Sequence, residues 1–125
     1  MDNARRCADL FDVPVAIEGL YPSAREPWLV ATWEEYRRLL DSGVPFALDL
    51  SHLNILATWS GRLDMGLTAE MLSSERCIEV HVSSNDGRHD QHRRCDAPAW
   101  WSPLLSSINP RAMVFTEGDH RQLET

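Results

Sequence analysis

Four short apolar segments recur along the chain at nearly constant spacing, and this repeat limits the available folds more than any other feature. The segments are VPVAI (13–17), PFALDL (45–50), CIEVHV (77–82) and AMVFT (112–116). Three of them are almost continuously apolar, which is typical of strands buried on both faces of a parallel sheet. CIEVHV alternates more and places Glu79 and His81 on one face, where Glu79 would either partner the histidine or sit against a helix.

Helical patterns occupy the intervals between these segments. Residues 2–11 carry apolar side chains at helical spacing. Thr32 followed by Glu35 forms a capping box, which predicts the start of a second helix. Gly43 is the expected C-terminal stop of that helix.

Two later helices are expected to be short. They cover 68–73 and 102–108, with Thr68 and Ser102 as their N-caps. Strands that alternate with helices in this way predict an α/β fold built on a parallel sheet. No linker interrupts the pattern, so we expect a single domain over residues 1–125.

A side chain that can bind a metal ion stands at the end of each apolar segment. The four are separated by 31, 32 and 36 residues and are Glu18, Asp49, His81 and Glu117. The C-terminal ends of parallel strands lie on one rim, as in the active sites of α/β barrels, so we expect these side chains to converge. Three carboxylates gathered without a basic residue would repel one another, and a bound divalent cation removes that cost.

A second group of metal-ligand types lies in segments that we expect to be loops. His52 stands three residues after Asp49, and Asp90 with His92 forms an i, i+2 pair. In extended backbone, such a pair points both side chains the same way. His52, Asp90 and His92 are therefore candidates for a second ion. Mixed imidazole and carboxylate ligands suit Zn²⁺, Mn²⁺ or Fe²⁺ better than Ca²⁺.

Composition narrows the class of protein. The chain has 125 residues, of which 43% are hydrophobic, enough for one domain with a core. No apolar run approaches the roughly 20 residues of a membrane span, and the N-terminus lacks a signal-peptide pattern, so we expect a cytoplasmic protein. Three cysteines without a C-x-x-C pair indicate reduced thiols. A net charge of −7 opposes a nucleic-acid partner.

Within residues 16–119, four stretches resemble the C-terminal half of a xylose-isomerase-like TIM barrel. They are AIEGLYP, DLSHLNI, VHVSSNDGRHDQH and FTEGD. This superfamily holds sugar-phosphate isomerases and epimerases and the endonuclease IV type of DNA-repair enzyme. In the ketose-epimerase branch one divalent ion is held by four side chains, and the resemblance implies Glu18, Asp49, His81 and Glu117 for them. A further ion of the endonuclease IV branch would fall on His52, Asp90 and His92.

Barrels of this superfamily have eight βα units in about 250 residues, whereas this chain has four. We therefore expect four parallel βα units that form half of a TIM (β/α)8 barrel. Such a half barrel would expose two strand edges and an apolar interior. A second copy of the chain or another protein would supply the missing half, unless the chain is a fragment.

The favoured function is a metal-dependent isomerase or epimerase that acts on a small sugar or polyol. The resemblance assigns the acid and base to Glu18 and Glu117, and His52 is a third candidate catalytic residue. The metal would be Mn²⁺, Zn²⁺ or Fe²⁺. Three alternatives stay open: a phosphodiester hydrolase of endonuclease IV type, a multinuclear non-haem iron enzyme that oxidises peptides, and an inactive half-barrel assembly module.

Overall fold

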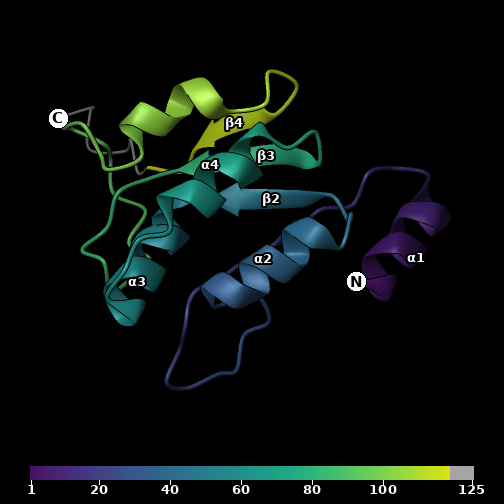
Figure 1. Ribbon diagram of the computed structural model, residues 1–125, viewed down its shortest axis with the longest axis horizontal. Coiled ribbons are helices and arrows are strands. Elements are labelled where there is room, and N and C mark those ends of the chain that lie inside the picture. The colour runs from purple at the N-terminus through teal and green to yellow at the C-terminus, as the bar shows by residue number, and fades with distance from the viewer. Residues whose placement is uncertain (119–125) are drawn as a thin grey trace, which may run out of the picture.

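The computed structural model describes residues 1–118 and has an α/β architecture (Figure 1). Four strands form one sheet in the order β1-β2-β3-β4, and each neighbouring pair is parallel. Their bounds are β1 (Ile17–Glu18), β2 (Phe46–Asp49), β3 (Cys77–Val82) and β4 (Met113–Thr116). The predicted α/β class, with helices between the strands of a parallel sheet, is confirmed.

Five helices connect or precede the strands. They are α1 (Asp2–Phe11), α2 (Trp33–Asp41), α3 (Leu50–Ser60), α4 (Met65–Ser73) and the 3-10 helix η1 (Ser102–Ser107). The capping box predicted for α2 is present in both directions, since Glu35 N donates to Thr32 Oγ1 and Thr32 N donates to Glu35 Oε2. Gly43 then has a φ of 76°, which glycine adopts without strain, and the chain turns toward β2.

Helices α2, α3 and α4 cover one face of the sheet. Leu48 and Val80 are register partners, and both are buried in a core with side chains of α2, α3 and α4. Because side chains alternate along a strand, the next residues face the opposite side. Asp49, His81 and Phe115 occupy that opposite face in register with one another. We call it the inner face, and the candidate site lies at its C-terminal edge.

Several sequence-based expectations about the elements were wrong in detail. The segment 13–17 contributes only the end of a strand, and Glu18 belongs to β1 itself. The fourth segment is exposed throughout β4, because residues 1–118 leave this edge strand uncovered on both faces: Met113 and Phe115 lie on the inner face and Val114 on the other. His52 lies in α3, which begins directly after β2, and not in a loop.

The two short helices also begin differently from the prediction. Helix α4 starts at Met65, three residues before Thr68, because Asp64 accepts a hydrogen bond from Leu67 N and is the N-cap. The segment expected to form a helix to Ile108 forms a 3-10 turn instead, and its Trp101 cap makes no side-chain hydrogen bond.

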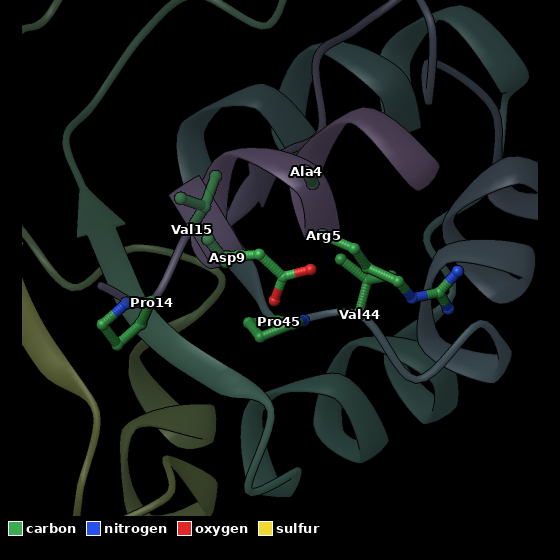
Figure 2. A pocket seen from close by; sticks show the side chains of 8 residues that line it. Ala4, Arg5, Asp9, Pro14, Val15, Val44 and Pro45 are labelled. Carbon is green, nitrogen blue, oxygen red and sulfur yellow. The ribbon is translucent and has the colours of Figure 1, made fainter. Parts of the chain in front are cut away.

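Helix α1 lies at the end of the sheet opposite to the candidate site. In Figure 1 the strand arrows point away from it. Figure 2 shows a pocket of about 250 Å³ between α1 and the segments that lead into β1 and β2, with Arg5 and Asp9 as its charged lining residues. No described helix has the length and apolar character needed to cross a membrane, and the predicted cytoplasmic location stays a prediction.

Candidate metal centre

Three of the four residues at the strand ends meet closely at the C-terminal rim. One ligand atom from each of Glu18, Asp49 and His81 lies within 4.8 Å of the others. The register explains this arrangement, because Asp49 pairs with His81 across β2 and β3, while β1 runs beside β2. His81 Nδ1 is 3.4 Å from Glu18 Oε1.

Glu117 completes the set of strand-end residues. Its Oε1 atom is 3.6 Å from His81 Nδ1, and its Oε2 atom is 3.5 Å from His92 Nδ1. The backbone fixes this position, since Glu117 N donates to Val82 O at the end of β3. The two oxygens of this one carboxylate therefore face two different histidines.

Asp49 performs two separate tasks with its two oxygens. Its Oδ1 atom accepts hydrogen bonds from the backbone N–H groups of Ser51 and His52, which makes it the N-cap of α3. Its Oδ2 atom is buried, has no hydrogen-bond partner and lies 3.4 Å from His52 Nε2. A buried carboxylate oxygen without a partner is costly, and a cation beside it would remove that cost.

His52 is held with one nitrogen turned toward the carboxylates. Its Nδ1 atom is 3.1 Å from Gly19 O, and a carbonyl can only accept, so Nδ1 carries the hydrogen. The Nε2 atom then presents a lone pair at 3.2 Å from Asp90 Oδ2. Two acceptors at this distance require a shared proton or a cation between them. Metal-bound histidines usually show this pattern, with the second nitrogen donating to a fixed acceptor.

His81 has the same arrangement with its nitrogens exchanged. Its Nε2 atom is 2.6 Å from Glu79 Oε1. Its Nδ1 atom is buried, lacks a hydrogen-bond partner and lies between Glu18 and Glu117. Burial lowers the pKa of His81, but the hydrogen bond to Glu79 and the surrounding carboxylates outweigh burial, so the net pKa is raised.

The loop after β3 is held by several hydrogen bonds and carries Asp90 and His92, the other two residues of the second ligand group. Both polar atoms of the Asn85 side-chain amide bind α3. Its Oδ1 accepts from Asn54 Nδ2 at 2.7 Å and its Nδ2 donates to Ser51 O at 2.9 Å. The loop then returns so that Asp90 reaches His52 from a position 38 residues later. His92 follows with a φ of 46°, an uncommon value for a residue other than glycine.

His92 is the most exposed member of this second group. Its Nε2 atom is 3.4 Å from Asp90 Oδ2, so Asp90 lies between two imidazoles. Asp90 Oδ1 is buried without a hydrogen-bond partner. The structure thus brings together all seven side chains singled out in the sequence: Glu18, Asp49, His52, His81, Asp90, His92 and Glu117.

The cluster is strongly acidic. Within residues 1–118, no arginine forms an ion pair with any of its four carboxylates, Glu18, Asp49, Asp90 and Glu117. Burial raises the pKa of Glu117, with the negative charges of Asp49 and Glu18 adding to the rise and the two neighbouring histidines opposing it. Such a site favours binding of a cation.

The donor set fits divalent transition metals. It offers carboxylate oxygens and imidazole nitrogens without a cysteine, a mixture that suits Zn²⁺, Mn²⁺ or Fe²⁺. Asp49 Oδ2 and His81 Nδ1 are the strongest evidence for the fit, because both are buried, lack a hydrogen-bond partner and face the same small space. Separations of 3.4–3.6 Å between ligand atoms leave room for an ion at ordinary bond lengths.

Sequence reasoning missed the groups that support the histidines. The Gly19 carbonyl and the Asn85 tether give no sequence signal of their own, since a backbone acceptor and a loop amide are recognised only by what they contact. Tyr21 was also missed, and its ring packs edge-on against His52 with centroids 5.1 Å apart. Burial, together with the charges of Asp90 and Asp49, raises the pKa of the Tyr21 hydroxyl.

No protein-family model, curated protein or solved structure matches the chain. Asp119, the last residue of the FTEGD stretch that carries the family resemblance, lies outside the described residues. The function is therefore inferred from the geometry of the site.

Proposed function

We propose that this chain is a divalent-metal-dependent isomerase or epimerase that acts on a small sugar or polyol. One observation carries the proposal: two buried ligand atoms without hydrogen-bond partners, Asp49 Oδ2 and His81 Nδ1, face the same space between Glu18 and Glu117. Four side chains of metal-ligand type surround that space, and Glu18 and Glu117 are 39% and 34% exposed. The site is therefore open to a small molecule.

The chemistry follows from the placement of the two glutamates. A divalent ion there would polarise the carbonyl and hydroxyl oxygens of a bound substrate and so acidify the adjacent C–H bond. Glu18 in β1 and Glu117 just after β4 approach His81 Nδ1 from the two outer strands of the sheet, which flank β2 and β3. One would remove the proton as a base and the other would return it as an acid. The raised pKa of Glu117 suits it to hold a proton.

The proposed architecture is half of a TIM barrel of xylose-isomerase-like type. Two features support it: the four parallel strands follow one another in chain order, and Met113 and Phe115 on the inner face of β4 are left exposed by residues 1–118. Parallel sheets are normally covered on both faces, so a second copy or another protein would cover this one. Closure of the barrel would also surround the proposed metal site with loops from both halves.

A second candidate function has its own observation. His52, Asp90 and His92 form a second group of ligands beside the first, and Glu117 faces both groups with different oxygens. Two adjacent ions would suit metal-assisted hydrolysis of a phosphodiester, as in the endonuclease IV type, or iron-dependent oxidation of a peptide. The acidic cluster and the net charge of −7 oppose a nucleic-acid substrate.

Metal content and reactivity test these proposals. The purified chain is stripped with a chelator, titrated separately with Mn²⁺, Co²⁺, Zn²⁺ and Fe²⁺, and analysed for bound metal per chain. We expect one ion per chain in a variant in which His52 is replaced by glutamine, and none in Asp49→Asn combined with His81→Gln. The protein is also assayed with Mn²⁺ or Co²⁺ on a panel of ketoses. Exchange of a carbon-bound proton of the sugar with solvent would support isomerisation.

Other results would favour the alternatives. Zinc-dependent cleavage of a phosphodiester would replace isomerase with hydrolase, and oxygen consumption with iron would indicate oxidation. A wild-type chain that binds no metal would contradict the proposal and leave an inactive assembly module. The exposed double variant Glu34→Gln with Glu75→Gln is the matched control, because it removes two carboxylates outside the cluster.

A further inference from the structure

We propose that Glu79 is a positioning residue that determines which nitrogen His81 offers to the metal. This inference rests on the proposed metal site and deepens it. Glu79 lies two residues before His81 on β3, so both side chains project from the inner face of the sheet. Glu79 Oε1 is 2.6 Å from His81 Nε2, the shortest contact that either group makes.

The direction of this hydrogen bond fixes the tautomer. An ionised carboxylate can only accept, so His81 Nε2 must carry the hydrogen. In the neutral ring, Nδ1 is then left with its lone pair, and Nδ1 is the atom that lies 3.4 Å from Glu18 and 3.6 Å from Glu117. Without Glu79, the ring would instead favour a hydrogen on Nδ1, because Glu18 and Glu117 are acceptors at that side. That tautomer cannot bind a metal through Nδ1.

The contacts of Glu79 point to this role. Its carboxylate is 38% exposed, and among residues 1–118 it forms an ion pair only with His81. Within that same part of the chain it neither caps a helix nor pairs with an arginine. His52 shows the same arrangement with a backbone acceptor, since Gly19 O holds its Nδ1 hydrogen and leaves Nε2 for the site. The two histidines therefore use different nitrogens, each selected by an acceptor behind the ring. Acceptors of this kind typically change metal affinity by about 10- to 100-fold.

Nitrogen NMR of the histidines reads the tautomer directly in the metal-free protein. The spectrum is recorded at about pH 9, above the ordinary histidine pKa of about 6.5, and the His81 signal is assigned from its loss in His81→Gln. We expect wild type to show hydrogen on Nε2 of His81. Glu79→Gln keeps an oxygen acceptor and should retain that tautomer. Glu79→Ala should shift His81 toward the Nδ1–H tautomer.

Metal affinity is measured in the same proteins by titration with Mn²⁺ and Zn²⁺. Glu79→Ala should bind about 10- to 100-fold more weakly than wild type, with Glu79→Gln between the two. Glu75→Gln, at an exposed position two residues before β3, is the matched control and should bind as wild type does. If Glu79→Ala does not fold, the wild-type tautomer together with the Glu79→Gln affinity decides the question.

Two outcomes would overturn the inference. One is a wild-type His81 that carries its hydrogen on Nδ1, and the other is a folded Glu79→Ala protein with unchanged tautomer and affinity. A wild-type chain that binds neither metal would instead contradict the proposed function. The tautomer comparison in metal-free protein would still test whether Glu79 positions His81, so the two failures are distinguishable.

Discussion

Asp49 Oδ2 and His52 Nε2 lie 3.4 Å apart at the start of α3, in a contact between two side chains that are 1% and 6% exposed. The same Asp49 caps α3 through its other oxygen. A single carboxylate therefore stabilises a helix and also contributes negative charge to the site. The two roles belong to different oxygens, so a substitution can separate them.

Asp49→Asn should retain the helix cap and lose the metal. The amide oxygen can still accept from Ser51 N and His52 N, while the amide NH₂ replaces the oxygen that faces the ion. We expect the free energy of unfolding of the metal-free variant to lie within about 1 kcal/mol of the wild-type value. We expect metal binding to be abolished. Thermal unfolding in chelator and metal titration measure the two effects.

Asp49→Ala is the informative comparison for that variant. It removes the cap as well, which typically costs about 0.5–2 kcal/mol. It should therefore be less stable than Asp49→Asn in chelator and equally unable to bind metal. Retention of wild-type metal affinity by Asp49→Asn would show that Oδ2 is not a ligand.

Much of the strand-end arrangement could be predicted because it depends on short-range patterns. An apolar run followed by Asp49 or His81 indicates both a strand and a residue at its C-terminal end, and parallel pairing then brings those ends together. The helical placement of His52 was not predictable in this way. Leu50 is apolar and continues the strand pattern, and only the Asp49 cap shows that the helix begins there.

The supporting groups of the site depend on long-range contacts. Asn85 and Asn54 meet across a separation of 31 residues, and Gly19 meets His52 across 33. No local pattern contains that information. The exposure of β4 could not be predicted either, because its apolar sequence is typical of a buried strand, whereas residues 1–118 leave it uncovered.

The metal-free and metal-bound forms should respond to pH in opposite directions. The pKa values of His81 and Glu117 are both raised in the folded protein. At these two groups the folded metal-free chain therefore binds more protons than the unfolded chain, and their contribution to stability should fall as pH rises through the raised pKa values. Metal binding requires the deprotonated groups, so the stabilisation by metal should grow over the same rise in pH.

Thermal unfolding between about pH 5 and about pH 8 checks this prediction, once with chelator and once with excess Mn²⁺. The difference between the two unfolding temperatures should widen as pH rises. His81→Gln is the control, because it removes one of the two titrating groups and should flatten the metal-free profile. Parallel profiles with and without metal in wild type would contradict the linkage.

Asn85→Ala should weaken the second ligand group more than the first. The Asn85 side chain ties the loop that carries Asp90 and His92 to α3 by two hydrogen bonds. Each such bond contributes about 0.5–1.5 kcal/mol, and their loss should loosen the approach of Asp90 to His52. We expect loss of any second bound ion while the first is retained.

Metal per chain, measured for wild type and Asn85→Ala, tests that expectation. Asp96→Asn lies further along the same segment at an exposed position and serves as the control. Equal loss of both ions in Asn85→Ala would show that the two groups form one indivisible site.

Gly19→Ala should destabilise the fold and disturb His52. A Cβ at Gly19 would overlap the ring and hydroxyl of Tyr36, which is fully buried and donates to Leu20 O. Overpacking of this kind typically costs about 1–3 kcal/mol. Because Gly19 O holds His52 Nδ1, displacement of this segment should also weaken metal binding.

Denaturant unfolding and metal titration measure the two effects of Gly19→Ala. Gly61→Ala is the matched control for the metal effect, because a Cβ there meets no other atom within 4 Å and its φ of 69° confines the cost to local backbone strain. It should lower stability without changing metal affinity. If the Gly19→Ala protein folds and binds metal as wild type does, Tyr36 can move aside without cost to the site.

Closure of the proposed half barrel makes a prediction about mass in solution. Met113 and Phe115 lie on the inner face of the edge strand and are 60% and 42% exposed, an unusual state for a parallel sheet. If a second copy covers this face, sedimentation should give more than the 14.2 kDa of one chain. Met113→Asn should then weaken association by about 10- to 100-fold, since burial of such a side chain contributes about 1.5–3 kcal/mol. Leu10→Asn, at an exposed residue of α1 that is not part of the inner face, is the control and should associate as wild type does. A wild-type chain that stays monomeric at every concentration would exclude a second copy, and closure would then require a different protein.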